Sequence, residues 1–263
     1  MLKKLLKYEL SAFYKFIYPF YGLALLFALL TRMFLSFEGN LAAKIIGEIF
    51  RGACISMFCS SLVNNFMRLM VRFRQSLYGD ESYLLHTLPL TRGIVYGAKI
   101  VTVLITFFTS FLFTLASLAI MFCRAGFFQT VKDFVAQLTE TTGGNVWLLV
   151  IGMLALLWLE FINLQQCVFT GIILGHRRAD HKMGFSFLFG AVAYLVGQGI
   201  TLAIIAILAI FNQEIQGLFV RNQMPSTSTF CMLIWIFAGV YLLLVAGFWK
   251  FNVRCLNQGM DVE

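Results

Sequence analysis

Apolar residues along the chain gather into six long runs that are separated by short polar segments. Each run is about 20 residues or longer, which is the length that an α-helix needs to cross a bilayer. The predicted spans are approximately residues 18–37, 46–71, 100–123, 146–174, 185–211 and 230–249. We therefore predict an all-α polytopic membrane protein in which residues 1–263 form a single transmembrane domain.

Residues 1–15 carry an amphipathic pattern of their own, with leucines at helical spacing and a polar stripe that includes Lys4 and Lys7. Such a helix lies along the inner leaflet with its lysines toward anionic headgroups. Pro19 would kink one straight helix or begin a new one. We predict a lateral elbow helix that is retained in the mature protein; the alternative is a simple extension of the first span.

Composition and charge agree with a membrane protein. Hydrophobic residues make up 60% of the chain, charged residues 12%, and the mean hydropathy is +0.85, whereas a soluble domain has roughly 25% charged residues. The net charge of +8 does not indicate a nucleic-acid partner, because the basic residues flank apolar runs as membrane orientation signals do.

The distribution of basic residues predicts that both termini are cytoplasmic. In that orientation the cytoplasmic ends hold Lys3, Lys4, Lys7, Lys15, Arg72, Arg74, Arg92, Lys99, Arg177, Arg178, Lys182, Lys250 and Arg254. The outer side holds only Lys44, Arg124, Lys132 and Arg221.

Several polar residues fall inside the predicted spans. Glu160 lies near the middle of the fourth span, Asn163 continues its stripe, and Gln198 lies midway along the fifth. A carboxylate at that depth rarely faces lipid, so these residues either line a translocation pathway or subunit interface, or hold the bundle together by hydrogen bonds. In the second span Glu48 and Arg51 are three residues apart and can pair on one helix face.

Small residues and absent motifs add two expectations. Gly171-x-x-x-Gly175 is a spacing that permits close helix packing. The chain has no G-x-x-x-x-G-K-[ST] phosphate loop and no hydrolase or zinc-protease motif, and its His and Cys spacings do not indicate a metal site. We therefore expect a non-enzymatic chain that binds no metal or cofactor directly.

The segment GDESYLLHTLPLTR, residues 79–92, lies between the second and third spans. Gly79 breaks the preceding structure, Asp80 is a good helix N-cap, and Glu81 adds negative charge in the first turn. Pro89 disfavours helical geometry at Leu88. The segment is therefore predicted to be a short apolar helix on the cytoplasmic side, and an apolar surface exposed to water indicates a docking partner.

The stretch LLHTLPLTRGIVYGAK resembles the L-x-T-L-P-[VL]-[ST]-[RK] segment of membrane subunits of type-2 ABC exporters, especially a group common in Gram-positive bacteria. The N-terminal KLLKYELSAFYKFIYPFYGLALL is similar to the opening of that group, where an elbow helix precedes the first span. Six spans, cytoplasmic termini and a length near 260 also fit. The group often has Gly where Ser82 stands.

The resemblance implies a role for both segments. The loop between spans two and three would be a coupling helix that docks on a separate ATP-binding subunit, and ATP and Mg²⁺ would be bound by that partner. Lys4, Lys7 and Glu9 would be elbow residues near the interface. A second permease subunit, identical or different, would complete the pathway in the cytoplasmic membrane of a bacterium, surrounded by its lipids. The implied coupling residues are Asp80, Glu81, Tyr83, Leu84, Leu85, His86, Thr87, Leu88 and Pro89.

Two other functions stay open. The chain could be a stand-alone membrane protein, either an ion-coupled carrier or an intramembrane enzyme, with Glu160 as its central group. It could also be a six-span subunit that captures a substrate or senses a ligand for a larger complex.

Overall fold

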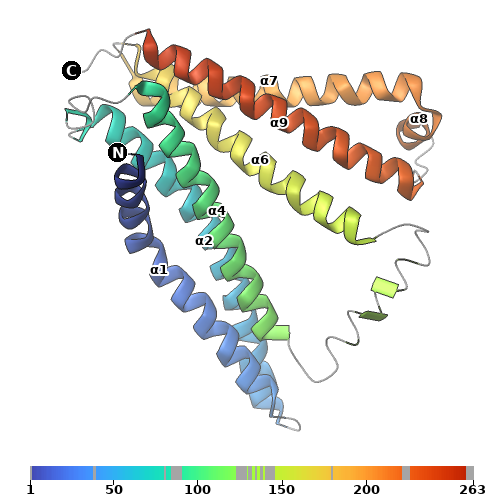
Figure 1. Ribbon diagram of the computed structural model, residues 1–263. Helices are drawn as coiled ribbons and strands as arrows, with labels where there is room; N and C mark the ends of the chain where they lie inside the picture. The colour runs from blue at the N-terminus through green and yellow to red at the C-terminus, as the bar shows by residue number, and fades with distance from the viewer. Residues whose placement is uncertain are drawn as a thin grey trace. The chain divides into compact units, whose positions relative to one another are not determined.

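A computed structural model of the chain describes residues 2–37, 40–79, 81–83, 91–122, 129, 132–133, 135–136, 139, 146–178, 180–220 and 226–258 (Figure 1). The chain divides into two compact units, Met1–Thr130 and Val131–Glu263. We call them unit 1 and unit 2 and describe each by itself. The joining of both units into a single transmembrane domain stays a prediction.

Unit 1 contains three long helices, α1 (Leu2–Leu35), α2 (Leu41–Tyr78) and α4 (Arg92–Phe122). The side chain of Asn40 caps α2 by accepting a hydrogen bond from the backbone N–H of Ala42 at 3.1 Å, which satisfies one of the donors that a helix start leaves open. α1 packs against both α2 and α4, and these two also contact each other. The three helices therefore form a bundle (Figure 1).

The first helix continues through its internal proline. α1 runs from Leu2 to Leu35 with Pro19 inside it, and its first turns are bent relative to the rest (Figure 1), as expected where a proline removes a backbone hydrogen bond. Residues 2–15 therefore begin the same helix that forms the first span. Whether they lie along a membrane surface stays a prediction. The buried face of α1 comprises Glu9, Phe13, Ile17, Tyr21, Ala24 and Ala28.

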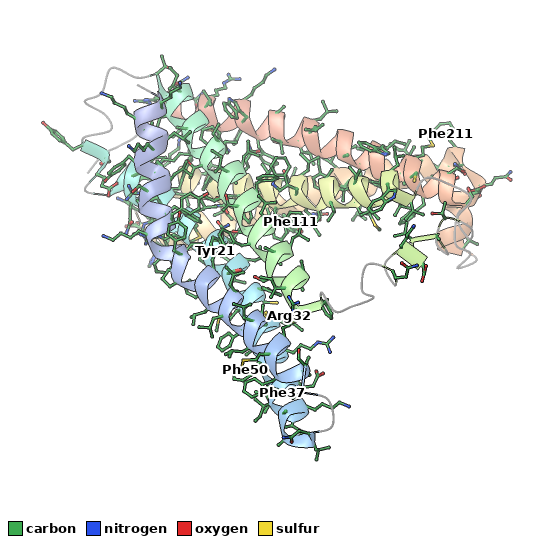
Figure 2. The ribbon with its side chains drawn as sticks, turned by 60° about the horizontal axis from the view of Figure 1, so that its bottom comes forward. Tyr21, Arg32, Phe37, Phe50, Phe111 and Phe211 are labelled. Atoms are coloured by element: carbon green, nitrogen blue, oxygen red, sulfur yellow. The ribbon has the colours of Figure 1, made fainter. Side chains whose placement is uncertain are left out.

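Hydrogen bonds between side chains join the three helices of unit 1 partway along the bundle. The Tyr21 hydroxyl of α1 (Figure 2) lies 2.5 Å from Ser110 Oγ of α4, and Asn65 Nδ2 of α2 donates to the same oxygen at 2.6 Å. Asn65 also donates to the backbone oxygen of Thr106 at 3.2 Å. Hydrogen bonds of this kind contribute to helix association where lipid removes the hydrophobic driving force.

Unit 2 contains α6 (Val146–Gly175), α7 (Lys182–Phe211), the short α8 (Gln213–Val220) and α9 (Thr227–Asn257). α6 packs against α7 and α9, and α7 contacts α8. The residues at 221–225, between α8 and α9, lie outside the described part of the chain.

Glycines bring α6 and α7 close together. A Cβ atom placed on Gly171 would lie 2.6 Å from the backbone nitrogen of Gly190, and one placed on Gly175 would lie 2.5 Å from the backbone nitrogen of Ser186. Real Cβ atoms do not approach backbone atoms that closely, so only glycine fits at these positions. The predicted close packing at Gly171-x-x-x-Gly175 is confirmed.

Six helices among the described residues are long and apolar enough to cross a membrane: Lys3–Leu35, Leu41–Tyr78, Arg92–Phe122, Val146–Gly175, Lys182–Phe211 and Ser228–Asn257. Their length and apolar character confirm the prediction of a multi-pass, all-α membrane protein. Most of the helices extend beyond the predicted spans, by eight residues at the start of α4 and at the end of α9 and by seven at the end of α2, because helical structure continues past the point where hydropathy falls.

Candidate functional site

Four charged side chains meet in unit 1, and we call Glu9, Arg72, Glu81 and Lys99 the ionic cluster. Lys99 Nζ donates to Glu9 Oε1 at 2.6 Å. Arg72 Nε lies 3.4 Å from Glu9 Oε2, and Arg72 Nη1 donates to Glu81 Oε1 at 2.8 Å. Glu9 thus contacts both cations, and Arg72 contacts both carboxylates.

The helix arrangement of unit 1 brings these residues together. Glu9 lies near the start of α1, Arg72 near the end of α2, and Lys99 in the second turn of α4. Because consecutive helices run in opposite directions, the start of α1, the end of α2 and the start of α4 share one end of the bundle. Ser76, one turn after Arg72, accepts a hydrogen bond from Lys99 Nζ at 2.5 Å.

Most of the ionic cluster is shielded from water. Glu9 is 2% exposed, Lys99 3% and Arg72 8%, while Glu81 is half-buried. The Tyr8 ring lies over the Arg72 guanidinium, 5.1 Å from the ring centroid to Cζ. Burying charge is costly unless opposite charges are paired. The cluster meets that condition because it holds two cations and two carboxylates, so it carries no net charge.

The ionic cluster contacts the beginning of the predicted coupling segment. α2 ends at Tyr78, and the backbone N–H of Gly79 bonds to the oxygen of Gln75 at 3.1 Å. Ser82 is buried and Tyr83 is 74% exposed; both are helical. Glu81 therefore belongs at once to the segment and to the cluster. The predicted coupling residues Asp80, Leu84, Leu85, His86, Thr87, Leu88 and Pro89 lie outside the described residues.

The three predicted elbow residues differ in their surroundings. Lys4 and Lys7 are exposed, as expected for a polar stripe, whereas Glu9 is buried. Glu9 occurs one helical turn before Phe13, so it extends the buried face of α1 and is not part of its lysine stripe.

The polar residues predicted in the fourth and fifth spans come together within unit 2. Tyr241 of α9 is buried and lies near Glu160 of α6 and Gln198 of α7. The Asn163 amide lies 3.8 Å from the position that a Cβ atom on Gly197 would take. Glu160, Asn163 and Gln198 therefore face the same region between α6, α7 and α9.

Buried amides on α6 lack partners in the described part of the chain. Gln165 and Gln166 are 0% exposed, and neither their side-chain oxygens nor their nitrogens make a hydrogen bond there. Asn163 Oδ1 is also buried and makes no hydrogen bond with the described residues. An unpaired buried amide is destabilising, so α6 contains a polar stretch that the described residues of unit 2 do not satisfy.

Sequence patterns missed Arg72, Ser76 and Lys99 as members of a site. The two cations were interpreted only as cytoplasmic orientation signals, because they lie at the ends of apolar runs. Two features of the sequence hinted at a polar site. Glu9 is the single acidic residue before residue 38. Arg72 and Ser76 are four residues apart and therefore lie on one face of a helix.

No family model matches the chain, and neither a curated protein nor a solved structure matches it.

Proposed function

We propose that the chain is the membrane-spanning permease subunit of an ATP-driven ABC exporter in the cytoplasmic membrane of a bacterium. A separate ATP-binding subunit docks on residues 80–89, and a second permease subunit completes the translocation pathway. One observation supports this role most strongly: Glu81, at the start of the docking segment, bonds to buried Arg72, which contacts Glu9 at the start of α1.

The ionic cluster gives this proposal a physical mechanism. A partner that displaces the docking segment pulls Glu81 away from Arg72. Arg72 is then a buried cation with less compensation, and such a state is costly. The side chains of α1, α2 and α4 relieve that cost by rearranging around Glu9 and Lys99. A displacement outside the bundle is thereby transmitted to three spans at once, as in other switches built on bistable contacts.

Purification of the tagged full chain from its native membranes tests the proposal. An ATP-binding subunit with a phosphate loop should co-purify and hydrolyse ATP. Leu84→Asp and Leu88→Asp should release it or uncouple hydrolysis from transport. Leu41→Asp is the matched control, because Leu41 is 76% exposed at the opposite end of unit 1. The proposal would be contradicted if no ATPase co-purified with the chain. It would also be contradicted if the Leu84 and Leu88 variants still bound the ATPase and still coupled its hydrolysis to transport.

A second candidate function is a stand-alone ion-coupled carrier. The meeting of Glu160, Gln198 and Tyr241 favours it, because intramembrane carboxylates with polar neighbours mark ion pathways. This function predicts transport into liposomes without ATP, lost in Glu160→Gln. The stand-alone carrier would be excluded if transport required ATP and the partner subunit and if Glu160→Gln stayed active. That result would favour the permease.

A further inference from the structure

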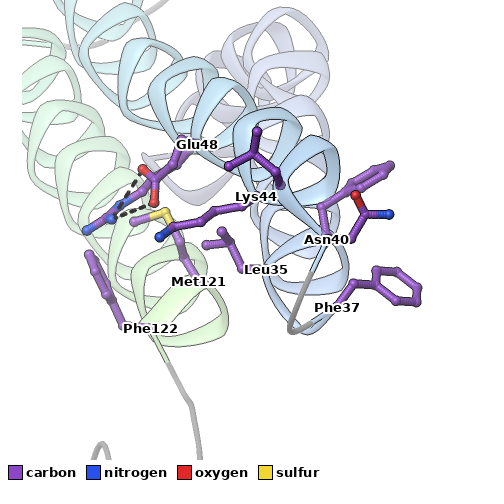
Figure 3. A pocket seen from close by; sticks show the side chains of 10 residues that line it. Leu35, Phe37, Asn40, Lys44, Glu48, Met121 and Phe122 are labelled. Atoms are coloured by element: carbon purple, nitrogen blue, oxygen red, sulfur yellow. Dashed lines mark hydrogen bonds and ion pairs between the residues drawn. The ribbon is translucent and has the colours of Figure 1, made fainter.

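A pocket of about 600 Å³ lies in unit 1 at the end of the bundle opposite the ionic cluster (Figure 3). Three helices contribute to it: the last turn of α1, the first turns of α2 and the last turn of α4. Its volume falls within the range of roughly 300–1,000 Å³ that small-molecule sites occupy.

One part of the pocket wall is apolar. Phe34 and Leu35 come from α1, and Met121 and Phe122 come from α4. Phe37 follows α1 and is 59% exposed. An apolar wall of this size favours a hydrocarbon chain over a small polar solute.

The other part of the pocket wall is charged, and its described residues include two cations and one carboxylate. Arg51 Nη1 lies 3.4 Å from Glu48 Oε1, and its guanidinium lies over the Phe122 ring at 5.1 Å. Lys44 has no ion-pair partner within the described residues, and its ammonium points toward the same side of the pocket as Glu48 and Met121 (Figure 3). The described residues of the lining thus carry a net charge of +1 beside an apolar surface.

We propose that this pocket binds a single-chain amphiphile with an anionic headgroup. The alkyl chain lies along Leu35, Met121 and Phe122, and the headgroup is bound by Lys44 with Arg51 beside it. Glu48 holds the Arg51 guanidinium in place and leaves Lys44 to the ligand. A carboxylate and a phosphate monoester share this chemistry. The proposal does not depend on an ATP-binding partner or on the transport function.

Photolabelling of the full-length protein in nanodiscs of zwitterionic lipid tests the proposal. The probe is a diazirine analogue of oleate, and its matched control is the primary alcohol with the same chain. We expect the acid to label residues 34–51 and 121–122 saturably. Its half-saturating concentration should be roughly tenfold lower than that of the alcohol, because the alcohol lacks the charge-assisted hydrogen bond. Equal labelling by acid and alcohol would overturn the proposal.

Competition with unlabelled oleate and with lysophosphatidate distinguishes a carboxylate from a phosphate ligand. Displacement of the probe by either acid supports the proposal, and the more potent competitor identifies the headgroup. Displacement by neither acid contradicts it.

Charge reversal provides a second test with a matched control. Lys44→Glu changes the net charge of the lining from +1 to −1, and Lys44 is exposed, so the fold does not depend on it. Arg32→Glu reverses the charge of an exposed residue of α1 that does not line the pocket (Figure 2). Lys44→Glu should raise the half-saturating concentration of the acid roughly tenfold or more, and Arg32→Glu should leave it unchanged. Equal effects of both variants would overturn the proposal.

Discussion

The Lys99 ammonium of α4 lies 2.6 Å from the Glu9 carboxylate of α1, and both side chains are almost completely buried. Ninety residues of sequence separate them. Arg72 and Glu81 balance the pair, so the charges at this end of unit 1 depend on one another. Removal of any one member leaves a buried charge without its full compensation.

Lys99→Met should lower the free energy of unfolding by about 3 kcal/mol, because breaking a buried ion pair leaves its partner uncompensated. Unfolding of the purified protein in mixed micelles measures this loss. Adding Glu9→Gln to Lys99→Met should recover part of it, since one charge of each sign has then been removed. Lys15→Met, at an exposed position of α1, should have little effect. A double variant less stable than Lys99→Met would contradict the proposed charge balance.

The six spans could be predicted from the sequence because lipid selects long apolar helices and leaves few alternatives. Hydropathy alone did not define their ends. α2 continues to Tyr78 and α4 begins at Arg92, since backbone hydrogen bonds persist where side chains become polar. The short helix α8 was also not predicted, because an eight-residue segment next to an apolar run has no separate periodic signal.

The ionic cluster itself was not predicted from the sequence. The resemblance to ABC exporter subunits implied that Glu9 is an elbow residue and Glu81 a coupling residue, whereas Arg72 and Lys99 were interpreted as orientation signals. A single sequence does not show which charges from three different helices pair, because their meeting depends on helix rotation and packing. The pair Glu48 and Arg51 was predictable because both lie on one helix, three residues apart, and it is observed at 3.4 Å.

Asn64 and Asn65 are neighbours in sequence but should differ in their effect on stability. Asn65 donates to Ser110 and Thr106 of α4, whereas the one acceptor of Asn64 among the described residues is the Ser60 oxygen of its own helix. Asn65→Ala should therefore destabilise the protein by about 1 kcal/mol, in the range measured for hydrogen bonds between membrane helices. Asn64→Ala should cost clearly less. The same unfolding measurement compares them, and equal losses would show that the contact with α4 contributes nothing.

Gly171→Ala should separate α6 from α7, because its Cβ would meet backbone atoms, which cannot move aside as a flexible side chain can. We expect a loss of about 2 kcal/mol, typical of overpacking in a packed interior. Gly199→Ala on α7 is the matched control, since a Cβ there would have open space around it. Thermal unfolding of both variants gives the comparison. If Gly171→Ala is as stable as Gly199→Ala, the helices are not in close contact there.

Glu214 of α8 should make the start of α9 sensitive to acid. Hydrogen bonds from the Thr229 hydroxyl, and from the hydroxyl and backbone N–H of Ser226, lower the pKa of the Glu214 carboxyl below its ordinary value. A carboxyl with a lowered pKa in the folded state stabilises that state above its unfolded pKa of about 4.3. This stabilisation is lost as the pH falls through the lower, folded value. Amide hydrogen exchange at residues 226–230, corrected for intrinsic exchange, should therefore show less protection in acid.

Glu214→Gln separates this effect from general acid unfolding. The glutamine oxygen can still accept a hydrogen bond, but the side chain does not titrate. Protection at the start of α9 should be lower than in the wild-type protein near neutral pH, because a neutral acceptor binds hydroxyl donors less strongly than a carboxylate does. It should also change little as the pH falls. An equal loss of protection in acid for both proteins would place the titrating group elsewhere.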